Sequence, residues 1–269
     1  MEITLVYLVA GISSRFGGKI KQLAKIGPDN ETLIEYSLKQ TISAGITKII
    51  FIVGEKTEKP FKEMFGDNYK GIPVYYAFQT YDKTKRDKPW GTLDSLFSAK
   101  SLINSPFIVC GGDDIYGKKA FEKLVKHLKN NSNNATIGYK LKNVLSEKGT
   151  VNRGIFQVDL DNNVTEIKEY FKIDSSNLNE KGLTKESLCS MLLFALQPNI
   201  FDMLEEKIIK FKQEHQEDRT KEVLAPEEIG KLIQEKKITM KCYPTEEEWI
   251  GITNPEDEYY VKKKLIKKI

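Results

Sequence analysis

The chain has 269 residues, of which 40% are hydrophobic and 30% charged, so one or two globular domains with sizeable cores are expected. The formal net charge is only +4 and the charges are mixed along the chain, which argues against nucleic acid as a partner. Without a signal-peptide pattern or a run of ~18 apolar residues, no membrane partner is expected either. The three cysteines lack metal-ligand spacing and favour a reducing cytoplasm.

Apolar runs and helical patterns alternate along the first half of the chain. Strands are expected at 3–9, 48–53, 73–78 and 106–111, and helices at 31–44, 91–103 and 119–128. Short apolar strands separated by helices are typical of a parallel sheet with helices on both faces. This half therefore predicts a Rossmann-like α/β fold.

The pattern changes near residue 142. Residues 154–170 hold a polar turn between two apolar stretches, which indicates a hairpin, and 177–185 form a polar loop. A strand at 187–196 and a helix at 198–211 follow. We interpret the whole chain as one domain with a mixed, mainly parallel sheet, divided into a nucleotide-binding part (1–141), an antiparallel sugar-binding elaboration (142–200) and a closing part (201–269).

The first strand ends in a turn of glycine, serine and positive charge, LVAGISSRFGGKIKQL at residues 8–23. Glycines let backbone N–H groups face an anion, while Arg15 offers a planar fork and Lys21 a compact charge to phosphate oxygens. Six residues separate Gly11 from Gly18, so this is not a Walker loop, and the dinucleotide fingerprint is also absent. We interpret it as another kind of phosphate loop. The alternative is a tight turn without a ligand.

A second strand end carries two acids, in FIVCGGDDIYG at residues 107–117. Open parallel sheets bind ligands outside the carboxyl ends of their strands, and carboxylate oxygen is a ligand that Mg²⁺ prefers. Asp113 is therefore expected to hold the metal of a magnesium nucleotide. Asp114 is expected to cap the next helix or to orient its neighbour. Without the phosphate loop, the sequence around Asp113 would be explained equally well by an aspartate that caps the following helix.

Five segments, in this order, resemble those of the nucleotidyltransferases that activate sugar 1-phosphates, and among them the N-acetylglucosamine-1-phosphate uridylyltransferase domain. They are the loop at 8–23, PWGTLDSL at 89–96 preceded by Gln79, GGDDIYG at 111–117, the hairpin at 154–170, and WIGITNPEDE at 249–258. The resemblance implies a cytoplasmic enzyme that joins a nucleoside triphosphate to a sugar 1-phosphate and releases pyrophosphate, with Mg²⁺ as cofactor. A homo-oligomer is compatible with it.

The resemblance also implies roles for individual residues. The residues expected to contact the nucleotide and its phosphates are Ala10, Gly11, Arg15, Lys21, Gln79, Gly91 and Thr92. Those expected to meet the sugar are Gly154, Glu169 and Ser190, and those expected to bind the metal are Asp113 and Asn254, with Thr253 as the alternative to Asn254. Arg15, Lys21 and Asp113 would carry the catalysis. His127 and His215 are expected on the surface, and Trp90 and Trp249 in core packing.

The arrangement of Gln79 with Gly91 and Thr92 resembles that of uridine readers. UTP is therefore expected as the donor, with N-acetylglucosamine 1-phosphate ahead of glucose 1-phosphate as the acceptor. A cytidylyltransferase acting on an alcohol or choline phosphate is the alternative, slightly favoured by ITNPED. A glycosyltransferase that uses GGDD as its metal motif is a further alternative, which the loop with Arg15 and Lys21 disfavours. A non-catalytic subunit that senses nucleotide sugars is another, which the presence of Arg15, Lys21 and Asp113 disfavours.

Overall fold

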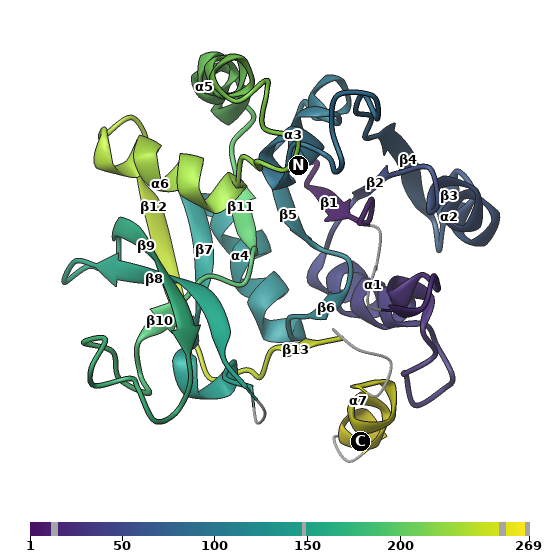
Figure 1. Ribbon diagram of the computed structural model, residues 1–269. Coiled ribbons are helices and arrows are strands. Elements are labelled where there is room, and N and C mark those ends of the chain that lie inside the picture. Colours follow the sequence, from purple (N-terminus) through teal and green to yellow (C-terminus); the bar gives the residue numbers. More distant parts are fainter. Residues whose placement is uncertain (12–15, 147–148, 253–256, 267–269) are drawn as a thin grey trace.

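The structure, a computed structural model, describes residues 1–11, 16–146, 149–252 and 257–266 (Figure 1). Within these ranges eleven strands form one sheet in the order β3-β4-β2-β1-β5-β11-β7-β10-β8-β9, and β12 also pairs with β7. The parallel core of this sheet consists of β1 (Thr4–Leu8), β2 (Lys48–Val53), β4 (Ile72–Phe78) and β5 (Phe107–Gly111). The expected mixed α/β fold with a helix-flanked sheet is confirmed.

Helices cover both faces of the parallel core. Leu5 and Tyr7 of β1 pack in the same buried cluster as α1 (Leu33–Ala44), α2 (Glu58–Phe65) and α4 (Lys118–Asn130). Val6 packs in a second cluster with α3 (Thr92–Phe97), α5 (Ile200–Glu214) and α6 (Ala225–Gln234). Successive strand residues point to opposite faces, so a strand covered on both sides needs a continuous apolar run, as seen at 3–9.

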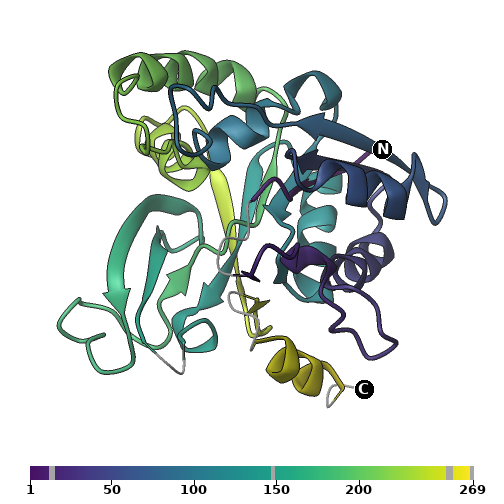
Figure 2. The same ribbon diagram turned by 45° about the vertical axis from the view of Figure 1, so that its right-hand side comes forward.

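The second part of the sheet is mainly antiparallel. It contains β7 (Asn134–Lys140), β8 (Val151–Val158), β9 (Val164–Ile173), β10 (Leu188–Cys189), β11 (Phe194–Leu196) and, parallel to β7, β12 (Met240–Thr245). The β8–β9 hairpin lies on the side of the molecule away from α1 and α2 (Figure 2). The remaining elements are β3 (Asn68–Tyr69), β6 (Asp114–Ile115), β13 (Ile250–Gly251), α7 (Asp257–Ile266) and the short 3-10 helices η2 (Lys21–Leu23), η3 (Lys100–Leu102) and η4 (Leu141–Asn143).

Two expected elements are interrupted. The prediction of one continuous strand at 187–196 is wrong. The segment forms two strands, β10 and β11, because Leu192 between them adopts a left-handed φ of 57°. The break lets β10 pair with β7 and β8 while β11 crosses to β5. The helix expected at 91–103 ends at Phe97, where the Ser98 hydroxyl donates to the carbonyl of Ser95 at 2.6 Å, and η3 follows separately.

Other elements agree closely with expectation or were overlooked. Helix α1 has a capping box between Thr32 and Glu35 and ends at Gly45, whose φ is 101°. The overlooked elements are α2, α6, β7 and β12; β7 lies behind an asparagine-rich stretch that looks like a polar tract. Among the described residues, no helix combines the length and the apolar sequence that a membrane crossing would need.

Candidate functional site

The carboxyl ends of β1 and β5 lie side by side, with Leu8 in register with Gly111, and they bring Lys21 and Asp113 together. The Lys21 ammonium forms an ion pair with the Asp113 carboxylate, and the two side chains are 21% and 28% exposed. Ala10 is half-buried and Gly11 is exposed just beyond β1. Arg15 lies outside the described residues, so its role stays a prediction.

A close approach between the two strand ends requires glycine at position 112. Its N–H donates to the Leu8 carbonyl at 3.1 Å, and a Cβ there would lie 2.3 Å from Cγ1 of Val9. Any side chain would push the loop that carries Asp113 away from β1. The distance between Lys21 and Asp113 therefore depends on this glycine.

Asp114 does not cap helix α4, contrary to one of the two expectations for it. The first N–H groups of α4 donate instead to Glu247, from Lys119 at 3.2 Å and from Ala120 at 2.7 Å. The Asp114 carboxylate accepts from the buried hydroxyl of Tyr116 at 3.0 Å. Burial raises the pKa of Asp114 well above its usual range, and the charge of Asp113 raises it further.

The late segment 249–252 lies beside these two acids. Strand β13 pairs with β6, with Gly251 opposite Asp114, and the Ile252 N–H donates to the Asp113 carbonyl at 3.3 Å. A Cβ at Gly251 would lie 2.9 Å from Oδ1 of Asp114. Thr253 and Asn254 follow directly but lie outside the described residues, so the second metal ligand stays a prediction.

Gln79 and Gly91 meet at the end of β4. The Gln79 side chain is buried, and its Nε2 donates to the Gly91 carbonyl at 3.4 Å and to Oδ2 of Asp94 at 3.2 Å. Gly91 has a φ of 108°, and a Cβ there would lie 2.5 Å from the Val223 carbonyl. The expected third member, Thr92, directs its hydroxyl to α6, where it accepts from the Ala225 N–H at 2.9 Å.

The loop between Gln79 and Gly91 is held by Arg86, which the sequence analysis missed. Arg86 is 2% exposed, and its guanidinium lies 3.4 Å from the centre of the Trp90 ring. It donates to the carbonyls of Lys88 at 3.1 Å, Asp218 at 2.9 Å and Lys221. Trp90 is half-buried under this cation rather than packed in the core. The only sequence signal was one arginine in a lysine-rich loop.

Gly154, Glu169 and Ser190 form a cluster in the antiparallel part. The β8–β9 register places Gly154 opposite Glu169, and the Ser190 N–H donates to the Gly154 carbonyl at 2.8 Å. A Cβ at Gly154 would lie 3.2 Å from Oε2 of Glu169. Burial raises the pKa of Glu169, and the charge of Glu227 adds to this effect while Arg153 opposes it. The three residues expected at the sugar are thus neighbours.

Arg153, also missed, links the two parts of the site. Its guanidinium donates to the Val144 carbonyl at 3.0 Å and lies 5.4 Å from the centre of the Trp249 ring. Burial lowers the pKa of Arg153, whereas the negative charges of Asp114 and Glu169 act to raise it. One cation therefore lies within electrostatic reach of both the acidic strand end and the Gly154 cluster. In the sequence, the only indication that Arg153 belongs to the site was its position directly before Gly154.

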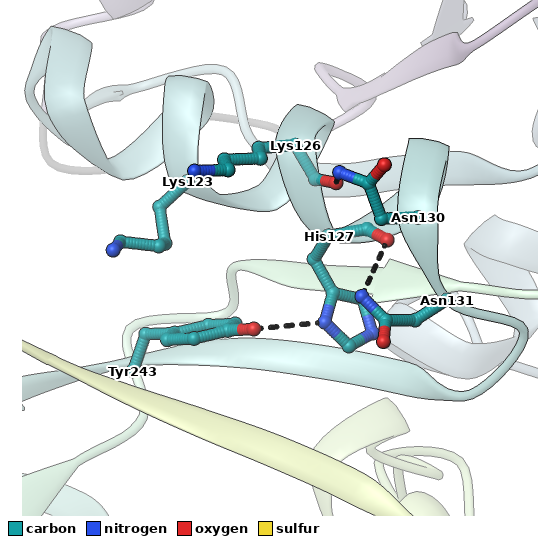
Figure 3. Close-up of a pocket in the computed structure, with 6 residues that line it drawn as sticks. All are labelled: Lys123, Lys126, His127, Asn130, Asn131 and Tyr243. Carbon is teal, nitrogen blue, oxygen red and sulfur yellow. Dashed lines mark hydrogen bonds between the residues drawn. The ribbon is translucent and has the colours of Figure 1, made fainter.

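A separate pocket of about 260 Å³ lies between α4 and β12 (Figure 3). Its lining residues are Lys123, Lys126, His127, Asn130, Asn131 and Tyr243. His127 is 3% exposed, so its expected surface position is wrong; its ring nitrogens bond the Tyr243 hydroxyl and the Asn133 carbonyl, both at 3.0 Å. Burial lowers the pKa of His127. None of the expected site residues that the structure describes lines this pocket.

Two curated proteins of Haloferax volcanii are each 26% identical to parts of this chain. One is a UTP–glucose-1-phosphate uridylyltransferase, matched over 113 residues, which are 41% of this chain and 43% of that protein. The other is a low-salt glycan biosynthesis nucleotidyltransferase, matched over 203 residues, which are 72% of this chain and 50% of that protein. The matches therefore span half or less of the length of these relatives.

The fold and the family extend over nearly the whole chain. A Bacillus anthracis protein assigned as a glucose-1-phosphate thymidylyltransferase, solved in complex with sucrose, has the same fold with a TM-score of 0.72. It is 14% identical, and the match covers 98% of this chain and 95% of that chain. The model of the nucleotidyl transferase family matches residues 18–266. The chain whose strand ends join Lys21 to Asp113 thus belongs to the nucleotidyl transferase family.

Proposed function

We propose that this chain transfers a uridylyl group from UTP to a hexose 1-phosphate and releases pyrophosphate, with N-acetylglucosamine 1-phosphate preferred to glucose 1-phosphate. The observation that carries this proposal is the meeting of Lys21 and Asp113 at the carboxyl ends of β1 and β5. A cation and a carboxylate at adjacent strand ends suit a magnesium–phosphate ligand. Family membership and the similarity to a uridylyltransferase support the same reaction.

In this reaction an oxygen of the sugar 1-phosphate attacks the α-phosphorus of the triphosphate. The bond from the α-phosphorus to the bridging oxygen breaks, and pyrophosphate leaves with the electron pair. The attacking oxygen is already anionic at neutral pH, so no general base is needed. What the protein must supply is alignment and compensation of negative charge. Lys21, and Arg15 from the same loop, would compensate charge on the phosphates.

Asp113 fits a magnesium ion. No group of three or more His, Cys, Asp and Glu side chains in the described parts of the chain is placed to hold a metal. Mg²⁺ does not need one, because it commonly binds to one or two carboxylates and completes its shell with substrate phosphates and water. The bound ion would neutralise charge on the phosphate oxygens. Asn254 is proposed as its second protein ligand.

The antiparallel cluster would bind the sugar. Glu169 can accept hydrogen bonds from sugar hydroxyls, and the missing side chain at Gly154 leaves room beside it. Ser190 is 9% exposed and lies next to both residues. Arg153, whose charge interacts with those of Glu169 and Asp114, is proposed to neutralise part of the phosphate that joins the sugar to the reacting centre. The preference for the N-acetylated sugar rests on the sequence resemblance.

A substrate panel tests the proposal. Pyrophosphate release is measured with ATP, CTP, GTP, UTP and dTTP, each against N-acetylglucosamine 1-phosphate, glucose 1-phosphate and choline phosphate. We expect the fastest release with UTP and a hexose 1-phosphate. Faster turnover of CTP with choline phosphate would establish the cytidylyltransferase alternative instead. No release from any pair would reject nucleotidyl transfer.

A matched pair of variants ties the activity to the site. Lys21→Met should reduce kcat/KM by about 10²–10³, the loss expected when a charged group stops stabilising a transition state. Lys25→Met changes an exposed lysine that follows Lys21 closely in the sequence, and it should have little effect on kcat/KM. Equal effects of the two substitutions would contradict the assignment of Lys21.

A further inference from the structure

We infer that Asp94 and Lys212 are positioning residues that fix the orientation of the Gln79 side-chain amide, and that the accepting Oε1 then faces the pairing-edge ring nitrogen of the base and selects bases that carry an N–H at that nitrogen. The inference rests on the proposed nucleotidyl transfer and on Gln79 as a reader of the base. Nothing in the sequence distinguished Asp94 or Lys212 from other surface charges. The structure joins them through contacts between three separate elements.

The Gln79 amide is enclosed on one side by acceptors. Gln79 is 8% exposed, and its own N–H continues the sheet by donating to the Val53 carbonyl at 2.9 Å. On the side of α3 its amide faces a carboxylate oxygen of Asp94 at 3.2 Å and the carbonyl oxygen of Gly91 at 3.4 Å. Both groups can accept hydrogen bonds, and neither can donate one.

Two acceptors on one side leave a single favourable orientation of the amide. The NH₂ group must point to Asp94 and Gly91, since the reverse orientation would place Oε1 against two other oxygens. Oε1 consequently points to the opposite side as the end of Gln79 that accepts hydrogen bonds. The assignment follows from the partners and does not depend on telling nitrogen from oxygen.

Lys212 holds the Asp94 side chain in place. Its ammonium, from the last turn of α5, forms an ion pair with Oδ1 of Asp94, whose side chain is 11% exposed. Oδ2 of the same carboxylate is left to Gln79. Lys212 also lies 5.9 Å from the centre of the Trp90 ring, so α5 and the loop before Gly91 pack around this contact.

An acceptor discriminates between the bases only at the ring nitrogen of the pairing edge, because the exocyclic amino groups of cytosine and adenine are also donors on that edge. Uracil and thymine carry an N–H donor at N3 and guanine carries one at N1, whereas cytosine N3 and adenine N1 are acceptors. A buried site that is arranged for one hydrogen-bond pattern rejects the opposite pattern strongly, because its polar group is left unpaired. Gln79 held in this way therefore favours UTP, dTTP and GTP over CTP and ATP.

The test compares base selectivity in the wild type and in Asp94→Asn. The ratio of kcat/KM for UTP to that for CTP is measured with one fixed sugar 1-phosphate. We expect the wild type to prefer UTP by about tenfold or more, and Asp94→Asn to lose about tenfold of that preference. The asparagine keeps the shape of the side chain but can also donate, so Gln79 can turn over. A purely structural role would lower both rates and leave the ratio unchanged.

Two further variants complete the design. Lys212→Met should lower the ratio by a smaller factor, since Asp94 stays but is no longer held, and it serves where Asp94→Asn does not fold. Glu205→Gln removes a charge from the same helix, where Glu205 pairs with Lys100 at 3.0 Å, and should leave the ratio unchanged.

The possible failures can be told apart. An active wild type that uses CTP as well as UTP, or active Asp94 and Lys212 variants with an unchanged ratio, would overturn this inference alone. A wild type that releases no pyrophosphate from any triphosphate would overturn the proposed function, and this inference with it.

Discussion

The two parts of the sheet build their shares of the candidate site in different ways. In the parallel part the residues lie beyond strand ends: Gln79 directly follows β4, Asp113 lies in the turn after β5, and Lys21 lies in η2, which follows β1 in the chain. In the antiparallel part Gly154 and Glu169 lie within β8 and β9, and the register of these strands joins them, while Ser190 directly follows β10. The first arrangement is set by where strands stop, and the second by how strands pair.

This difference determines how each part responds to substitution. A loop beyond a strand end depends on a few close backbone contacts, such as that of Gly112 with Val9. A cluster inside a hairpin has its backbone fixed by the ladder on both sides, so a side chain there can change with little effect on the fold. The predictions below test this contrast, from the largest expected effect to the smallest.

Asp113→Asn should have the largest effect on activity. The change keeps the shape and removes the charge, and we expect kcat to fall by about 10²–10⁴, or roughly 3–5 kcal/mol of transition-state stabilisation. Steady-state pyrophosphate release with and without a chelator measures it. Asp114→Asn is the control: its oxygen can still accept from Tyr116, so the loss should be much smaller. Equal losses of kcat in the two variants would show that Asp113 is wrongly assigned as the metal ligand.

Gly112→Ala should destabilise the protein, whereas Gly154→Ala should not. The added methyl group at 112 would lie 2.3 Å from Cγ1 of Val9, so we expect a loss of about 1–3 kcal/mol in a thermal or denaturant melt. At 154 the nearest atom is the end of the Glu169 side chain at 3.2 Å, which can move. Val9 is fully buried, so Val9→Ala is destabilising by itself, and the contact is tested by a double-mutant cycle. Gly112→Ala should cost much less stability in the Val9→Ala background than in the wild type, and an equal cost in both backgrounds would show that the contact is not the cause.

Glu169→Gln should affect the sugar and spare the nucleotide. We expect KM for the sugar 1-phosphate to rise about tenfold, as for the loss of one hydrogen bond to a charged group, with KM for UTP within about twofold of wild type. Initial rates with each substrate varied in turn give both constants. Glu166→Gln is the control: Glu166 lies on the opposite face of β9, so its substitution should leave both constants unchanged. A rise in both constants would place Glu169 outside the sugar site.

His127→Gln should have the smallest effect, and only on stability. Burial lowers the pKa of His127 in the folded protein, so the unfolded chain binds the proton more tightly. The stability contributed by the neutral ring is complete above about pH 6.5 and is lost as the pH falls below it. Melts from about pH 5 to 8 should therefore show the gap between wild type and variant narrowing at low pH. A constant gap would contradict this account.

The sequence was sufficient where structure is local. Strand positions in the parallel part, the end of α1 at Gly45 and the acids after β5 follow from runs of a few residues. Lys21 and Asp113 could be assigned to one site in advance because the carboxyl ends of parallel strands share one edge, but their ion pair was not predicted. The left-handed turn at Leu192 could not be foreseen, because a non-glycine residue in that conformation has no sequence signature.

What was missed depends on contacts between distant segments. Arg86 bonds to residues more than a hundred positions away, as Lys212 does to Asp94. Arg153 gains its importance only when the hairpin is placed against Asp114 and Trp249. Charged residues of this kind look like solvated surface in a sequence that is 30% charged. Gly154, Glu169 and Ser190 were predicted at the sugar only from the family resemblance. The sequence of one strand does not determine which residues of its partner strand lie opposite.

The pairing of β13 with β6 has a consequence for how the protein is made. The partner of Asp114 is Gly251, and the Asp113 carbonyl receives its hydrogen bond from Ile252. A ribosome releases the acidic turn long before it releases these partners, and domains fold as their segments emerge. Until Ile252 has left the exit tunnel, two adjacent carboxylates stand at an unfinished sheet edge. A nascent chain can therefore complete β1, β2, β4 and β5 early, while its acidic turn is completed only after Ile252 has emerged.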